Sequence, residues 1–300
     1  MIKSVTTLKL HVSAKQITSQ LKEEVEKHRF SLKKGIINTG WNSVFSNEDS
    51  LIFESNNFTV LKASIAKRSI PGPSLKVLAN ERLKQDKSCS DLSDDEVSSK
   101  LKEFENEIYK ALLPFQAPRF SDVIVFFDHD NDLLHIAESS KSGVDNVISL
   151  IRNTVESLPA ELIEFSLPTD FLTPIVQQLL EEKNPTIEDL EYEIKAPLKL
   201  SISGEESTVP SFEKYQDVFD TYKQKSFHAI ALNLSIKNKQ TSVTCQLDHG
   251  MKISKLKFLE FTATDETPTD EQSFLILSMT GIRSIIESIK SIIAEHHQGE

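Results

Sequence analysis

The chain contains few of the residues on which several common kinds of protein site depend. Only two of its 300 residues are cysteines, and Cys89 and Cys245 lie too far apart to form the paired-cysteine motif of a zinc or redox site. Only eight residues are glycines, and neither the GxGxxG motif nor the P-loop pattern occurs. These absences argue against a disulfide framework, a cysteine-based zinc site and nucleotide chemistry.

Long apolar runs are also missing. No run approaches the roughly 20 apolar residues that a helix needs to cross a bilayer, and residues 1–7 lack the apolar block of a secretion signal. The composition, 38% hydrophobic and 26% charged, is that of an ordinary globular protein long enough for two modest domains. We therefore expect an intracellular protein in a reducing compartment, with no membrane partner.

Charge is distributed unevenly around a net value of −11. Residues 1–87 carry +7, residues 88–213 carry −17, residues 214–257 carry +5 and the last 43 residues carry −6. We expect the two basic blocks to meet in the fold as one positive surface, while the acidic remainder limits unintended contacts with polyanions. The alternative is that these lysines are only the solvated faces of helices and strands.

Hydrophobic periodicity predicts strands mixed with helices in the first half of the chain. The expected strands cover residues 3–12, 50–54, 58–66, 123–127, 133–138 and the region near 162, and the expected helices cover residues 16–28 and 142–157.

A helical hairpin is predicted after Pro71-Gly72-Pro73, where the prolines interrupt regular structure. Its first helix spans about 74–87. The second begins at Ser93, which forms a capping box with Glu96, and runs to residue 112. We expect the two antiparallel helices to project from the body of the molecule.

The second half repeats the order of strand, turn, strand and helix. The pattern predicts a helix from 170 to about 182, a polar connection containing Pro185 and Pro197, a helix at 212–223, strands at 228–236, 242–248 and 252–261, a short apolar run at 274–279 and a closing helix at 281–295. The expected fold class is α+β, with two such α+β domains. Residues 1–70 with 119–168 form the central domain, residues 71–118 the hairpin tip, and residues 169–300 the C-terminal domain.

Asp128, Asp130 and Asp132 match the first three ligand positions of a calcium loop. Leu133 stands where that loop needs glycine, and Ser139 stands where it needs a bidentate glutamate. We therefore interpret this segment as a hairpin turn and predict no metal site there.

A magnesium-dependent exonuclease is the alternative function. Asp170 followed by Glu181 and Lys183 loosely resembles the two carboxylates and lysine of such enzymes. Those carboxylates belong on adjacent strands, however, whereas Glu181 and Lys183 end a predicted helix. We accordingly assign no catalytic residue and no cofactor.

The eight histidines form no recognisable metal motif. Trp41, the only tryptophan, follows Gly40. The favoured interpretation is a tight turn that buries the indole, and the alternative is a platform on which a base stacks.

Several short fragments follow one another in a fixed order over nearly the whole chain. They are Gly40-Trp41, Ile70-Pro71-Gly72-Pro73, Leu112-Leu113-Pro114 with Arg119-Phe120-Ser121, Leu150-Ile151-Arg152 before Leu158-Pro159, Ser254-Lys255-Leu256-Lys257-Phe258, and Met279-Thr280-Gly281. This order resembles that of the RdgC family of bacterial recombination-associated proteins.

This resemblance implies a non-catalytic, cytoplasmic, nucleoid-associated homodimer. Such a protein closes as a ring around double-stranded DNA, binds it with little sequence preference and restrains a RecA-type recombinase by occupying the DNA. The hairpin tips close one side of the ring and the C-terminal domains close the other. A third possibility is a protein-interaction module that acts on the recombinase directly.

Carried over by position, the resemblance also implies which residues contact DNA. They are Arg68, Lys76, Arg82, Arg119, Lys255 and Lys257. Family members carry an aromatic anchor for the dimer gate just before the Arg-Phe-Ser step, where this chain has Ala117. Either Phe115 takes over that contact or the gate is weaker. The segment 195–203 is also less basic than its family counterpart.

Overall fold

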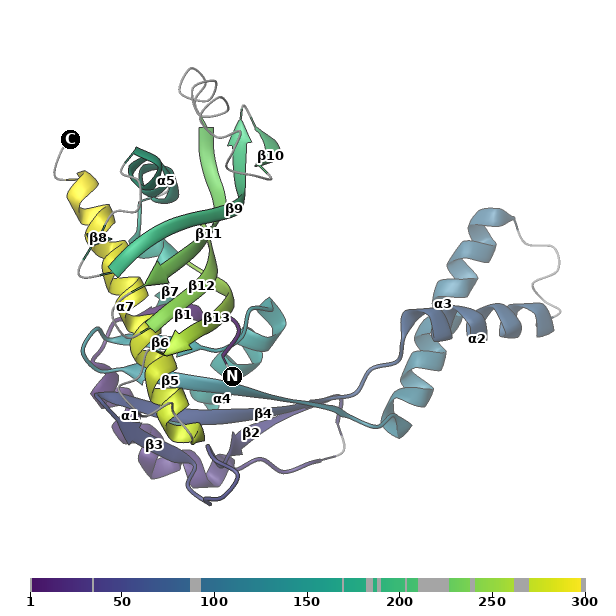
Figure 1. The fold of residues 1–300 in the computed structure, drawn as a ribbon. Helices are drawn as coiled ribbons and strands as arrows, with labels where there is room; N and C mark the ends of the chain where they lie inside the picture. Colours follow the sequence, from purple (N-terminus) through teal and green to yellow (C-terminus); the bar gives the residue numbers. More distant parts are fainter. Residues whose placement is uncertain are drawn as a thin grey trace.

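The structure is a computed structural model of mixed α+β class with two antiparallel sheets and, among the residues it describes, six α-helices (Figure 1). It describes residues 2–33, 35–86, 93–168, 170–181, 186–187, 190–202, 204–209, 227–237, 241–261 and 270–297. The expected helix at 212–223 lies outside these residues. None of the described helices is both long enough and apolar enough to span a membrane.

The first sheet has seven strands in the order β2-β4-β5-β6-β1-β7, with β3 paired to β4. The strands are β1 (Thr6–Leu10), β2 (Ile37–Asn42), β3 (Ile52–Ser55), β4 (Phe58–Lys67), β5 (Arg119–Asp128), β6 (Leu133–Ile136) and β7 (Ala160–Leu162). Strand β4 follows β3 through Asn56 and Asn57, which both adopt positive φ, a conformation that asparagine tolerates in tight hairpin turns.

Alternating residues give this sheet two buried faces. Leu61 and Ala63 of β4 pack in a core with helices α1 (Ala14–Glu24) and α4 (Lys141–Val155). Phe58 and Val60, on the other face of β4, pack in a second core that also contains the C-terminal helix. The first sheet therefore lies between two helical layers, as successive side chains on opposite faces allow.

The second sheet has the order β10-β9-β11-β12-β13, with β8 paired to β9. Its strands are β8 (Thr186–Ile187), β9 (Leu190–Ile202), β10 (Glu205–Val209), β11 (Phe227–Lys237), β12 (Thr241–Asp248) and β13 (Ile253–Phe261). Helices α5 (Leu172–Glu181) and α7 (Glu271–His297) contribute to the core that covers one of its faces.

Two sequence expectations for this half were wrong. The polar connection expected around Pro197 is part of the long strand β9, whose buried Tyr192, Ile194 and Leu198 keep the alternation of a strand on either side of the proline. The apolar run at 274–279 is not a separate element, because α7 continues through Gly281 as one helix. A β-carbon on Gly281 would lie 3.2 Å from the Phe258 ring, so packing favours glycine at this point of the helix.

Trp41 is buried as expected, but it lies in strand β2 and not in a tight turn. Its indole nitrogen donates a hydrogen bond to Thr154 Oγ1 on α4 at 2.9 Å. A β-carbon on Gly40 would come within 2.4 Å of the Phe30 backbone, so glycine is required by this close approach.

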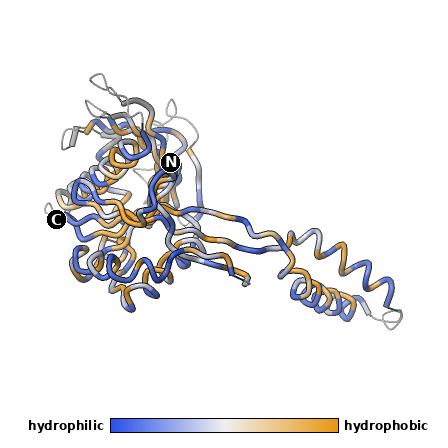
Figure 2. The backbone as a smooth tube through the Cα atoms, turned by 90° about the horizontal axis from the view of Figure 1, so that it is seen from below, coloured by the Kyte–Doolittle hydropathy of each residue, from blue (hydrophilic) through white to orange (hydrophobic). Residues whose placement is uncertain are grey.

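Helices α2 (Gly72–Gln85) and α3 (Asp94–Leu112) pack against each other and project far from the two sheets at the ends of β4 and β5 (Figure 1). We call these two helices the arm. The capping box of Ser93 and Glu96 is confirmed at the start of α3. Only Ala79 and Phe104 are buried in the two helices, and Figure 2 shows hydrophobic residues along both of them.

The two sheets share one hydrophobic core, which includes Phe126 of β5, Leu234 of β11 and Ile286 of α7. Backbone hydrogen bonds also join Val5 to Ile253, so that the segment before β1 extends the second sheet beside β13. The orientation of one sheet relative to the other is therefore fixed by both packing and hydrogen bonding.

His135 on β6 is a fully buried histidine in the first sheet. Its ring stacks on Phe126, and its Nδ1 lies 3.0 Å from the Thr7 hydroxyl. Burial lowers the pKa of His135 from 6.5 to about 3, because the apolar surroundings disfavour the imidazolium. The folded state therefore keeps this ring neutral at pH values where an unfolded chain would protonate it.

This histidine should make the protein less stable in mild acid. The free energy of unfolding does not depend on this group above pH 6.5. Below that pH the unfolded chain binds the proton and the folded chain does not, so the free energy of unfolding falls by up to about 1.4 kcal/mol per pH unit until the pH nears 3. Urea unfolding at several pH values, for the wild type and for His135→Gln, measures this slope. The variant should show the shallower decline, and equal slopes would contradict the assignment.

Candidate nucleic-acid interface

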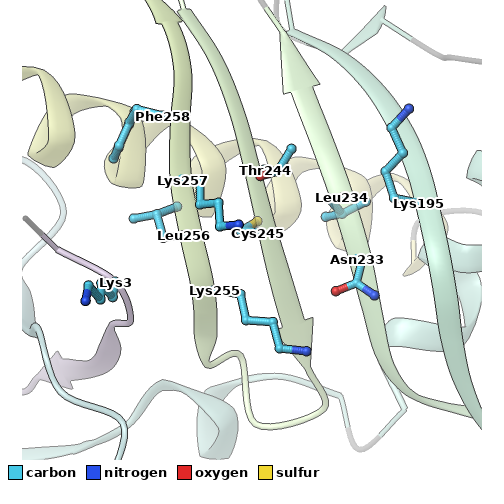
Figure 3. A pocket seen from close by; sticks show the side chains of 10 residues that line it. All are labelled: Lys3, Lys195, Asn233, Leu234, Thr244, Cys245, Lys255, Leu256, Lys257 and Phe258. Atoms are coloured by element: carbon cyan, nitrogen blue, oxygen red, sulfur yellow. The ribbon is translucent and has the colours of Figure 1, made fainter.

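A groove on the second sheet brings four lysines together. Lys195 on β9, Lys255 and Lys257 on β13 and Lys3 in the segment before β1 line a cavity of about 710 Å³ (Figure 3). All four side chains are exposed. The groove therefore combines lysines from the two basic blocks of the chain and from the acidic block between them.

The irregular pairing of β13 with β12 explains how two of these lysines reach the surface. The register shifts between Thr244 and Gln246, and Lys255 adopts a φ of 53°. Lys255 and Lys257 are both exposed, while Leu256 between them is buried. The Leu256 amide donates to the carbonyl of Lys3 at 2.9 Å, which places Lys3 beside β13.

The groove is electrostatically positive. Lys255 and Lys257 form no ion pair with any residue that the structure describes, whereas Lys195 pairs with Glu193. Cys245 also lines the groove, but burial raises the pKa of its thiol to about 12. The thiol stays protonated near neutral pH, so it does not offer a reactive nucleophile.

Two of the expected DNA contacts also stabilise the arm or its base. Arg68 donates from Nε to the Gln116 carbonyl at 3.1 Å and from Nη1 to the Gly35 carbonyl at 2.5 Å. Arg82 pairs with Glu107 at 2.7 Å, and its guanidinium lies 4.3 Å from the centroid of the Phe104 ring. Arg68 thus joins the segments around the base of the arm, and Arg82 joins α2 to α3.

The remaining predicted residues lie on the arm or where it meets β5. Lys76 is exposed on α2, and Arg119 is exposed at the first position of β5. Phe115 and Ala117, the expected gate residues, are both exposed, Phe115 to 84%. Of the six expected DNA contacts, Lys255 and Lys257 line one groove, and the other four lie on the arm or at its base.

Comparison with known proteins identifies the family of this chain. A family model described as "Putative exonuclease, RdgC" matches residues 1–291. The chain belongs to the RdgC family.

The resemblance drawn from the sequence is thereby confirmed. The recombination-associated protein RdgC of Shewanella sp. (strain W3-18-1) is 24% identical over 243 residues, which cover 77% of this chain and 74% of that protein. The protein of the same name from Shewanella loihica is 24% identical over 277 residues, covering 89% of this chain and 84% of that one. The one from Actinobacillus pleuropneumoniae serotype 7 is 24% identical over 164 residues, about half of each chain.

The family description names an exonuclease, and Asp170 is the first carboxylate of the exonuclease alternative considered from the sequence. Its carboxylate accepts a hydrogen bond from the Thr173 hydroxyl at 2.6 Å and lies 2.5 Å from His228 Nδ1. The side chain of Glu181 and the whole of Lys183 lie outside the described residues. Asp170 therefore binds the first turn of α5 and links it to β11.

The acidic turn between β5 and β6 forms ion pairs with an arginine of the same chain. Arg283 of α7 donates from Nε and Nη2 to both oxygens of Asp128 at 2.8 and 2.6 Å, and from Nη1 to Asp130 at 2.6 Å. Among the described residues, no group of three His, Cys, Asp or Glu is arranged to hold a metal ion. The turn joins α7 to the first sheet.

Sequence reasoning missed two of the groove lysines. The alternation of apolar and polar residues around Lys195 was the available signal for β9, and the proline in that segment obscured it. Lys3 had no local signal, because its position depends on hydrogen bonds to a strand some 250 residues away.

Proposed function

We propose that this RdgC-family protein is a non-catalytic, nonspecific double-stranded DNA-binding protein that acts in recombination. The observation that carries this proposal is the groove, in which lysines from three separate segments meet on the surface of a chain whose net charge is −11. The recombination-associated relatives make DNA a fitting polyanion.

The chemistry of the groove favours the DNA backbone over the bases. Lysine ammonium groups neutralise phosphates and release counterions, which gives affinity without sequence information. The amide group of Asn233, which also lines the groove, donates to the Pro197 carbonyl at 2.6 Å. This bond occupies one of the few polar groups in the groove that would otherwise read a base.

The salt dependence of DNA binding tests this function. If two copies each use four lysines, about eight phosphates are neutralised and log K should fall with log salt at a slope near −7. Fluorescence anisotropy with two duplexes of unrelated sequence measures the slope and the sequence preference together. Binding that is absent at low salt, or insensitive to salt, would contradict the proposal.

The proposal includes a homodimeric ring. The arm is the antiparallel helical hairpin that forms the tip of each copy and closes one side of this ring. Val77, Leu78 and Leu112 leave apolar surface exposed on the arm. Helix α2 carries three basic residues and one acidic residue, whereas α3 carries three basic and six acidic residues. Helix α2 is thus net positive and α3 net negative. In a two-fold contact, α2 of one copy would meet α3 of the second copy, and their charges are complementary.

The gate residue Phe115 provides a test of the dimer. Phe115→Ser should weaken self-association at least tenfold, because a buried aromatic side chain often dominates an interface. Sedimentation velocity over a range of concentrations measures the change. Phe165→Ser, which alters another exposed phenylalanine away from the arm, is the matched control. An unchanged dimer in Phe115→Ser would exclude this gate.

The remaining parts of the proposal describe how the copies close as a ring on DNA and what this ring does. Residues 1–70 with 119–168 would form the central domain and residues 71–118 the tip. Residues 169–300 would form the C-terminal domain that closes the opposite side. Occupation of DNA by the ring would restrain a RecA-type recombinase and hold the protein in the cytoplasm at the nucleoid. Capture of the recombinase without DNA would instead favour a direct protein contact.

A further inference from the structure

The outer face of the second sheet carries opposite charges at its two sides. Strand register places Glu193 opposite Ser235, Ser235 opposite Thr244 and Thr244 opposite Lys257. Residues that face each other directly across strands lie on the same side of a sheet. Glu193 and Lys257 therefore stand at the two ends of one row, about 14 Å apart at roughly 4.8 Å per strand spacing.

Lys195 lies next to the acidic end of this row. It is two residues from Glu193 on the same face of β9, and its Nζ pairs with Glu193 Oε1. Their side chains are 46% and 37% exposed, so both atoms are accessible from solvent. Of the four groove lysines, Lys195 alone forms an ion pair within the part of the chain that the structure describes.

We propose that Glu193 competes with DNA phosphate for Lys195 and thereby sets the affinity of the groove. The inference rests on the proposed function, and it adds a built-in competitor to that site. The carboxylate occupies the position on Lys195 Nζ that a phosphate oxygen would take, so DNA must displace it before it gains this contact. An exposed ion pair is weak enough for such an exchange to occur.

The pair also indicates how DNA crosses the sheet. Lys195 and Lys257 lie on opposite sides of strands β11 and β12, and Lys3 lies beyond β13. A backbone that contacts all of them runs across the strands, with the acidic side chains of β9 along one flank. Glu193 thus limits the path as well as the affinity.

Replacement of the competitor should strengthen binding. Glu193→Gln should bind duplex DNA three- to fivefold more tightly at about 0.1 M salt. This change in affinity corresponds to the free energy that an exposed ion pair typically contributes. The salt slope should become steeper by about 0.9 for each lysine released. Anisotropy titrations at several salt concentrations measure both quantities.

Two further variants separate this mechanism from general charge repulsion. Glu191→Gln makes the same charge change on the same strand and face, but Glu191 has no ion pair with a groove lysine. Its effect should be smaller. In a Lys195→Met background, Glu193→Gln should change affinity no more than Glu191→Gln does.

The outcomes distinguish the two proposals. Equal effects of Glu193→Gln and Glu191→Gln, or a Glu193→Gln effect that persists in Lys195→Met, would overturn the competitor role while leaving DNA binding intact. A wild-type protein that binds no DNA would instead refute the proposed function itself. Circular dichroism confirms that each variant is folded before its affinity is compared.

Discussion

Reversal of Lys255 and Lys257 to glutamate is expected to weaken duplex DNA binding on the order of 10³-fold at 0.1 M salt. Across two copies, the double variant removes about four phosphate contacts, and each contact contributes about 0.9 log units of K per tenfold change in salt. The loss should be the same for unrelated sequences, because lysine contacts to phosphate carry no base information. The salt slope should fall from near −7 to between −3 and −4.

Lys15 and Lys27 provide the control for this charge reversal. Both are exposed, and they lie on α1 and in the short helical segment after it, on the side of the first sheet that those helices cover. Their double glutamate variant has the same net charge as the groove variant. If both variants lose affinity equally, the binding surface lies elsewhere and net charge explains the loss. A loss confined to one DNA sequence would indicate base readout.

The sequence predicted the parts of this fold that depend on local chemistry. The capping box at Ser93 begins α3 where expected, because the side chain of Glu96 accepts from the Ser93 amide at 2.8 Å. The strands expected at 50–54 and 58–66 correspond to β3 and β4, and Asn56 and Asn57 between them tolerate the positive φ of a tight turn. Lys255 and Lys257 line the same groove, and their DNA contact stays a prediction.

Features that depend on distant parts of the chain were not predictable in this way. Strand β2 is short, and it is defined by contacts with distant segments, which include pairing with β4 and burial of Trp41 under α4. The first residues join the second sheet through hydrogen bonds to β13, so the sequence around Lys3 contains no sign of its neighbours. The same limitation hid the partner of the acidic turn, because Arg283 lies more than 150 residues from Asp128.

Arg283→Met should lower the free energy of unfolding by about 3–5 kcal/mol, the usual effect of leaving a buried charge without its partner. Asp128 is fully buried, and the Arg283 side chain is only 16% exposed. The guanidinium also lies 3.9 Å from the centroid of the Phe58 ring, so it has both a charged and an aromatic contact. Methionine preserves the apolar stem but leaves the buried Asp128 carboxylate without its cationic partner, so that hydrogen bonds from Asp130 and Asn131 remain as its polar contacts.

Urea unfolding of the full chain measures this loss, and Arg29→Met is its matched control. Arg29 also contacts two carboxylates, those of Glu26 and Asp49, but all three side chains are solvent-exposed. Solvent screening makes such pairs weak, so the control should lose far less stability. A loss for Arg283→Met as small as that of the control would show that the buried pair does not hold α7 to the first sheet.

The double variant Arg283→Met with Asp128→Asn tests the cause of the loss. Asparagine removes the negative charge but keeps a side-chain oxygen. This oxygen can accept the hydrogen bonds that the backbone amides of Asp130 and Asn131 donate to Asp128 in the native turn. The double variant should therefore be more stable than Arg283→Met alone. If it is equally unstable, the loss comes from the missing contact with Phe58 and from packing, and the uncompensated carboxylate is not its source.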